Sequence, residues 1–176
     1  MYIWVGCQLP QEFENRLRQL CRKENADLGL VETAFHLPQH ISLKISFDAG
    51  SNWQSVLDWL KGWCKNQQPF YVDLKSPEQV PGVLWIPAAE NETLRELHQN
   101  LDGQLEKLFG IGQHPFDVNF RFHTTLFQDA DEKLTAMYAR LKDLTFPESL
   151  QVNTFLLGIS EDNSPGSHRI VGEISV

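Results

Sequence analysis

The sequence predicts an α+β fold made of two similar halves, with mostly antiparallel sheets, helices on their outer faces and a central cleft on a pseudo-twofold axis. Three observations indicate it. Strand-like and helix-like segments alternate, and the order strand, helix, strand, helix, strand occurs twice. "YIWV" at residues 2–5 resembles "VLWI" at 83–86, an offset of 81. "HISL" at 40–43, the first motif, resembles "HTTL" at 123–126, the second motif, an offset of 83. Two copies at this spacing suggest duplication rather than a solenoid.

The first half opens with β-branched and aromatic residues at 2–9, which predict a strand. Pro10 then starts an amphipathic helix over 11–25. Residues 39–47 alternate strictly, as expected for a strand with one buried face. Helical periodicity returns at 51–66, where Trp53 and Trp63 fall on the apolar stripe and are expected in the core. Residues 69–76 predict another strand.

The second half repeats this order. Strands are predicted over 82–89, 119–128, 150–160 and 168–176, and helices over 91–110 and 130–144, with Gly110 ending the first of these helices. No linker or low-complexity tract divides the chain. We therefore expect residues 1–176 to form one domain of two pseudo-symmetric lobes, about 1–78 and 79–176.

Composition narrows the classes of partner. Fifteen basic against 23 acidic residues give a net charge of −8, which argues against binding long duplex DNA but fits an RNA end or a small cyclic nucleotide phosphate. Three cysteines without Cys-x-x-Cys spacing predict neither a disulfide framework nor a zinc site, and favour the cytoplasm. No apolar run reaches the roughly 18 to 20 residues of a membrane span, and no basic leader marks a signal peptide. We expect a monomer.

Strand alternation assigns the polar side chains around each motif to a common face. The first strand presents His40, Ser42 and Lys44, while the second presents Arg121, His123, Thr125 and Phe127. Leu43 and Leu126 take equivalent positions facing the core. If the pseudo-twofold axis passes between the two strands, the cleft holds two imidazoles and two hydroxyls in a symmetric arrangement.

Phosphodiester chemistry uses such a set. One imidazole can accept a proton from the nucleophile while the other donates one to the leaving oxygen. Hydroxyls can donate hydrogen bonds to the nonbridging oxygens, and Lys44 and Arg121 would add positive charge there. No carboxylate cluster of the kind that holds Mg²⁺ is visible, so we expect no metal and no cofactor.

The paired motif resembles the signature of the two-histidine (2H) phosphoesterase superfamily, and the chain is most similar to its bacterial 2′-5′ RNA ligase-like branch over nearly its whole length. The resemblance implies hydrolysis or ligation at 2′,3′-cyclic phosphates or 2′-5′ linkages, with His40 and His123 as catalytic acid and base. Ser42 and Thr125 would bind phosphate oxygens. By the same analogy His40 protonates the leaving 3′ oxygen and His123 activates water.

The chain departs from the family pattern at two positions. Ser42 replaces the commoner threonine, and Thr124 stands where an aliphatic residue is more frequent. Neither departure removes a catalytic group. A nucleotide- or RNA-end-binding module without catalysis, and a scaffold that inherited the fold, remain alternatives, because fold alone does not decide function.

Other polar and aromatic residues have simpler interpretations. A metal held by His36 and His40 is disfavoured because Pro38 breaks the helix that would stack them. His98 lies among polar residues of a helix and is expected to be solvated. Lys44 and Arg121 fit solvated charges as well as phosphate contacts. Candidates for a base-stacking aromatic are Phe127, Phe116 and Tyr71.

Overall fold

The protein forms three antiparallel sheets in the computed structural model, which describes residues 1–164 and 166–176, apart from the side chain of Thr33. The largest sheet has the order β2-β1-β8-β9, with bounds β1 (Tyr2–Gln8), β2 (His40–Asp48), β8 (Thr154–Ser160) and β9 (Arg169–Ser175). The second has the order β4-β5-β6, with bounds β4 (Glu78–Val80), β5 (Val83–Pro87) and β6 (His123–Gln128). A two-stranded sheet pairs β3 (Phe70–Val72) with β7 (Leu150–Val152).

Four α-helices and three short 3₁₀ turns complete the described structure. The helices are α1 (Gln11–Asn25), α2 (Trp53–Lys65), α3 (Glu92–Phe109) and α4 (Asp131–Leu141), and the turns are η1 (Thr33–His36), η2 (Gly50–Asn52) and η3 (Pro115–Asp117). Asn91 caps α3 by accepting a hydrogen bond from the Leu94 N–H, and Gly110 ends it with a φ of 66°. None of the helices described is long and apolar enough to cross a bilayer.

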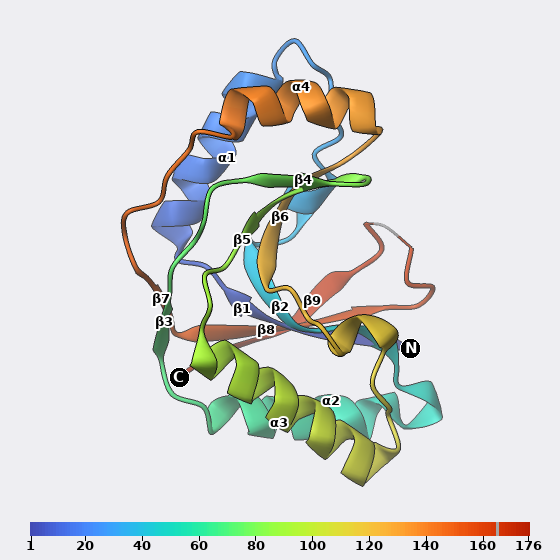
Figure 1. The fold of residues 1–176 in the computed structure, drawn as a ribbon. Helices are drawn as coiled ribbons and strands as arrows, with labels where there is room; N and C mark the ends of the chain where they lie inside the picture. Colours follow the sequence, from blue (N-terminus) through green and yellow to red (C-terminus); the bar gives the residue numbers. More distant parts are fainter. Residues whose placement is uncertain (165) are drawn as a thin grey trace.

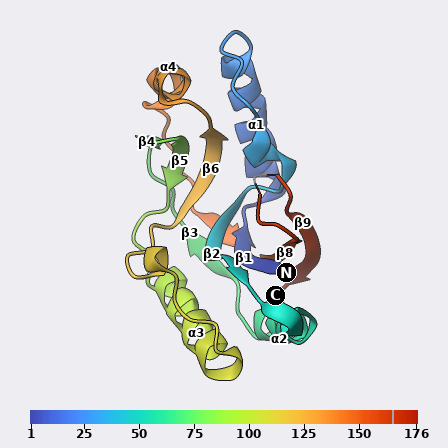
Figure 2. The ribbon, with the colours of Figure 1, turned by 90° about the vertical axis from the view of Figure 1, so that its right-hand side faces the viewer.

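The elements form two lobes, which Figure 2 shows side by side. One lobe holds α1, α2 and the four-stranded sheet, and the other holds α3, α4 and the three-stranded sheet (Figures 1 and 2). Each motif strand, β2 or β6, is an edge strand of its own sheet, and the two contact each other between the lobes. The predicted α+β fold with antiparallel sheets is confirmed.

The sheets do not divide at residue 78. Strands β8 and β9, from the end of the chain, extend the sheet of the first lobe because β8 pairs with β1. The strand expected over 150–160 is therefore two strands, since β7 pairs with β3 instead. Strand β4 was not expected, and residues 119–122 lie outside β6.

The core lies on the inner faces of the sheets, under the helices. Leu43 and Leu126 are both fully buried there, as the repeat predicts. Leu60 of α2 and Leu101 of α3 are also fully buried. The apolar sides of both motif strands are thus fixed by packing, which holds their polar sides toward the space between the lobes.

Candidate active site

Both motifs open on one pocket of about 290 Å³ between the lobes. Each motif histidine is the first residue of its strand, and each hydroxyl follows two positions later on the same side. The structure brings together four of the six residues expected at the site, because this pocket is lined by His40, Ser42, His123 and Thr125.

The two imidazoles are held by equivalent hydrogen bonds. Nδ1 of His40 lies 2.7 Å from the carbonyl oxygen of Pro38, and Nδ1 of His123 lies 2.6 Å from that of Arg121. A carbonyl oxygen only accepts, so each Nδ1 carries the hydrogen. Nε2 of each neutral ring therefore keeps its lone pair for a ligand or a proton.

Each imidazole also packs against a tryptophan of the neighbouring strand, stacked for His40 and tilted by 36° for His123. The ring centroids of His40 and Trp4 are 4.5 Å apart, and those of His123 and Trp85 are 4.0 Å apart. Trp4 lies against Gly158, where a Cβ atom would come within 2.0 Å of the indole nitrogen. The sequence analysis did not assign these tryptophans to the site, although the repeated "YIWV" and "VLWI" hold both.

Burial lowers the pKa of both motif histidines from its usual value of 6.5, while the hydrogen bond at Nδ1 raises it. The surroundings then differ. The Glu14 carboxylate also raises the pKa of His40, whereas the charges of His40 and Arg121 lower that of His123. The site is therefore symmetric in shape and asymmetric in charge.

A β-bulge at the same point of both motif strands breaks the predicted alternation. Gly6 pairs with Ser42 and Val5 with Lys44, so Leu43 has no partner of its own in β1. In the second lobe the register shifts in the same way at Leu126. Such a bulge places the next side chain on the opposite face.

The bulge corrects the expectation for Lys44. Its side chain is 1% exposed, and its ammonium forms ion pairs with Asp102, at 2.8 Å, and with Asp117. It does not line the pocket. Phe127, which occupies the equivalent position 83 residues later, is fully buried for the same reason. Phe127 therefore offers no surface to a base.

Arg121 also lies outside the pocket. Its guanidinium pairs with Glu78 at 2.6 Å and lies 5.0 Å from the ring centroid of Trp85. Its backbone carbonyl, rather than its side chain, contacts His123. Phe116 and Tyr71 are exposed but are not among the residues lining the pocket.

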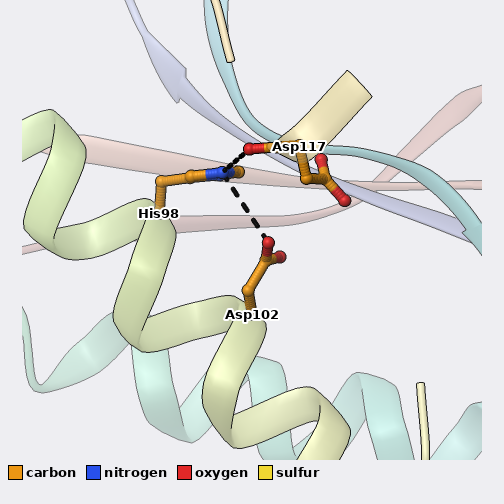
Figure 3. Close-up of side chains that lie close together, drawn as sticks. All are labelled: His98, Asp102 and Asp117. Atoms are coloured by element: carbon orange, nitrogen blue, oxygen red, sulfur yellow. Dashed lines mark hydrogen bonds and ion pairs between the residues drawn. The ribbon is translucent and has the colours of Figure 1, made fainter. Parts of the chain in front are cut away.

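Helix α3 and η3 supply a buried cluster next to the first motif (Figure 3). His98 is 4% exposed, which overturns the expectation of a solvated side chain. Its Nδ1 lies 2.7 Å from the carbonyl oxygen of Leu43, and its Nε2 lies 3.2 Å from that of Asp117. Ligand atoms of His98, Asp102 and Asp117 lie within 4.8 Å of one another, but the ammonium of Lys44 already pairs with both carboxylates. The cluster supports the strand that carries Ser42.

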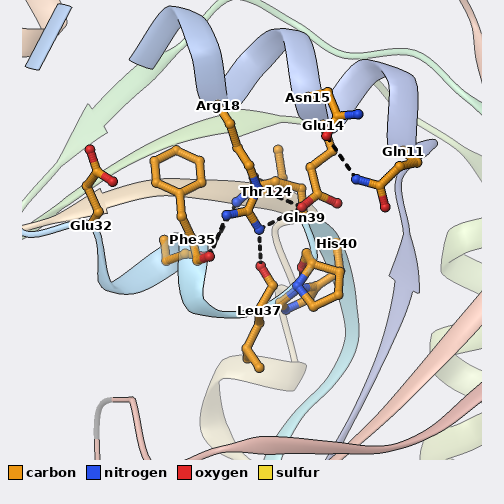
Figure 4. A network of polar contacts seen from close by, with 12 residues as sticks. Gln11, Glu14, Asn15, Arg18, Glu32, Phe35, Leu37, Gln39, His40 and Thr124 are labelled. Atoms are coloured by element: carbon orange, nitrogen blue, oxygen red, sulfur yellow. Dashed lines mark hydrogen bonds and ion pairs between the residues drawn. The ribbon is translucent and has the colours of Figure 1, made fainter. Parts of the chain in front are cut away.

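Arg18 of α1 holds the segment that leads into the first motif (Figure 4). Its guanidinium pairs with the buried Glu14 and donates to the carbonyl oxygens of Phe35 and Leu37. The pocket has further lining residues that the sequence analysis did not place there, among them His36, Gln39, Gln128, Asn163, Ser164 and His168. They come from separate segments, and no sequence pattern links them.

Comparison with known proteins matches residues 4–163 to the model of the 2′-5′ RNA ligase superfamily. TT0787 of Thermus thermophilus has a similar structure, with a TM-score of 0.68, 20% identity and coverage of 99% of this chain and 97% of that one. Escherichia coli LigT in complex with 3′-AMP is also similar, with a TM-score of 0.65, 19% identity and coverage of 99% of this chain and 96% of that one. Kluyveromyces marxianus Usb1 has a TM-score of 0.60 and 11% identity, with coverage of 99% of this chain and 98% of that one. No curated protein sequence matches significantly.

Proposed function

The chain belongs to the 2′-5′ RNA ligase superfamily, and from this membership we propose that it is a metal-independent phosphoesterase acting on the 2′,3′-cyclic phosphate, or a 2′-5′ linkage, of an RNA end or nucleotide. The observation that carries the proposal is the matched presentation of His40 and His123. Both rings have Nδ1 bonded to a carbonyl oxygen, both line one pocket, and both have a hydroxyl two residues on.

In hydrolysis of a cyclic phosphate, Nε2 of His123 accepts a proton from water as the water oxygen bonds to phosphorus. The bond from phosphorus to the 3′ oxygen breaks, and Nε2 of protonated His40 donates its proton to that oxygen. The product is a 2′-phosphate. Ser42 and Thr125 donate hydrogen bonds to the nonbridging oxygens as negative charge builds on them. Ligation is the same step with a 5′ hydroxyl in place of water: the 5′ oxygen bonds to phosphorus, the 3′ oxygen leaves with the proton from His40, and the product is a 2′-5′ linkage.

Surrounding charge supports these roles. Burial lowers the pKa of His40, and the carboxylate of Glu14 offsets part of this effect in favour of the protonated form that a proton donor needs. The charges of Arg121 and His40 disfavour protonated His123, which keeps it ready to accept a proton. A symmetric pair of rings would have no preferred direction of proton transfer.

The pocket also restricts the charge of the substrate. Among the residues described there, the lining includes no lysine, arginine, aspartate or glutamate. Positive charge there would therefore come from imidazolium, and His40 is its source in the proposed roles. A lining without lysine or arginine suits the single charge of a phosphodiester better than the two charges of a phosphomonoester. This supports binding of the cyclic substrate over retention of the product.

The ligands bound in related structures support a nucleotide ligand. LigT has been crystallised with 3′-AMP, NADP⁺ and ATP. Our proposal for this chain is narrower: a single cyclic phosphate between His40 and His123, with the rest of the nucleotide along the lining residues Asn163, Ser164, Gly166 and His168.

The test is hydrolysis of 2′,3′-cyclic mononucleotides and of oligonucleotides ending in a cyclic phosphate, with EDTA present. We expect turnover by the wild type and losses of at least about 100-fold in His40→Ala and in His123→Ala. His114→Ala, an exposed histidine outside the pocket, is the matched control. Activity that survives both substitutions together refutes the proposal. Tight nucleotide binding without turnover by the wild type would instead identify a binding module.

A further inference from the structure

One buried hydrogen bond joins the two motif segments. The Thr124 hydroxyl donates to Oε1 of Gln39 at 2.8 Å, and the two side chains are 1% and 2% exposed. Strands β2 and β6 belong to different sheets and share no backbone ladder. Within the described structure, this is the only hydrogen bond between segments 38–48 and 121–128.

The two partners are chain neighbours of the two motif histidines. Gln39 directly precedes His40, and Thr124 directly follows His123. Both ends of the bond are anchored, because the Gln39 carbonyl accepts a hydrogen bond from the Leu9 N–H and Thr124 pairs with Ile86 in the β5–β6 ladder. The bond therefore ties together the two chain segments that carry the imidazoles.

The repeat itself does not require a polar pair here. The counterpart of Thr124 in the first copy is Ile41, and the counterpart of Gln39 in the second is Phe122, since both pairs are 83 residues apart. Apolar side chains thus satisfy the same positions in the other copy. A buried hydrogen bond adds only about 1 kcal/mol to stability but demands a donor–acceptor distance near 3 Å, which apolar contacts do not.

We propose that Gln39 and Thr124 are positioning residues, whose hydrogen bond sets the spacing between His40 and His123 so that both rings reach one phosphate group. The effect of this positioning role on catalysis rests on the proposed function. It also accounts for the departure at Thr124 from the aliphatic residue frequent in the family. A hydroxyl, rather than bulk, is what this position contributes.

The experiment compares Thr124→Val, nearly the same shape without the hydroxyl, with Thr124→Ser, which keeps it. Gln39→Met removes the bond from the other side. On a 2′,3′-cyclic nucleotide we expect Thr124→Val and Gln39→Met to lower kcat/KM by about 10- to 100-fold. Thr124→Ser should remain within about threefold of the wild type. Ile41→Val, at the counterpart position, is the matched control and should leave kcat/KM unchanged.

A second readout does not need turnover. Inorganic phosphate is titrated while the ring resonances of His40 and His123 are followed by NMR. In the wild type both rings should respond with one midpoint, because one anion contacts both, and in Thr124→Val the midpoint should rise at least about tenfold. If the wild type hydrolyses no cyclic nucleotide, the proposed function fails while this titration still decides the positioning role.

Thermal unfolding of each variant checks that the protein is folded at the assay temperature, and Gln39→Met decides the question if Thr124→Val is not. Wild-type kcat/KM and phosphate response in folded Thr124→Val or Gln39→Met would overturn the proposal. So would an equal loss in Ile41→Val, because packing alone would then explain the effect.

Discussion

Lys44→Met separates two roles for Lys44, a phosphate ligand as the sequence pattern suggests, or a buried counter-ion as the structure has it. The substitution keeps the length of the side chain and removes its charge. It leaves the carboxylates of Asp102 and Asp117, at most 4% exposed, without their ammonium partner. The other basic side chain that we find beside them in the described structure is the imidazole of His98, whose Nε2 lies 3.7 Å from Asp102 Oδ2.

The expected cost is large for a single substitution. Removing one partner of a buried ion pair destabilises a protein by about 3–5 kcal/mol, because the remaining charge is buried and unpaired. In a domain of this size 1 kcal/mol lowers Tm by about 2–4 °C. Lys44→Met should therefore lower Tm by about 6–20 °C. Lys61→Met, which breaks the exposed pair with Asp58, should change stability by at most about 1 kcal/mol.

Calorimetry or circular dichroism gives Tm, and initial rates on a cyclic nucleotide well below that temperature give KM. We expect a lower Tm with KM within about twofold of the wild type. Asp117→Asn combined with Lys44→Met should recover part of the loss, since one unpaired charge is gone. An unchanged Tm with a raised KM would refute this reasoning and restore Lys44 as a phosphate ligand.

Three further predictions concern the pocket. Gly158→Ala places a Cβ atom within 2.0 Å of the Trp4 indole, so His40 loses its stacking partner. We expect a lower Tm and at least about a tenfold loss of activity. Gly62→Ala, where the added Cβ meets open space, should cause neither. Burial depresses the pKa of the imidazoles of His40, His123 and His168 in the folded state below 6.5, so the unfolded chain binds protons first as pH falls. The stability that these groups contribute is full above pH 6.5 and is lost as pH falls through their folded pKa values. Urea unfolding at pH 7.5 and 5.0 measures this loss. The prediction is contradicted if His168→Gln and the wild type lose the same stability between the two pH values. The pH profile of kcat/KM should peak below 6.5, since it reports the depressed pKa values of both rings in the free enzyme, and a peak above pH 8 argues against them as acid and base.

The sequence was sufficient to predict what depends on local periodicity and on repetition. Alternation and the two matching motifs place His40, Ser42, His123 and Thr125 on strand faces that meet, because both are properties of short segments. The α+β class and the antiparallel sheets follow from the same periodicity. The end of the helix at 92–109 follows from Gly110, which ends it as predicted.

What the sequence could not predict depends on pairing between distant segments. A bulge is a mismatch between two strands, so nothing within 39–47 reveals that Lys44 faces inward. The burial of His98 also depends on distant segments, because its hydrogen-bond partners, the carbonyl oxygens of Leu43 and Asp117, belong to other elements. Likewise β8 reads as a continuation of β7 until its partner, β1, is known.

The two copies agree where they face the pocket and differ where their neighbours touch them. The Nδ1 hydrogen bond, a tryptophan packed against the ring and the following hydroxyl occur in both. Twofold symmetry of these groups cannot distinguish a proton donor from a proton acceptor, yet hydrolysis needs one of each. The distinction must come from residues present in one copy only, and Glu14 beside His40 and Arg121 beside His123 act in opposite directions. Under the proposed function, the repeat would supply the pair of rings, and residues outside the motifs would set which ring donates a proton and which accepts one.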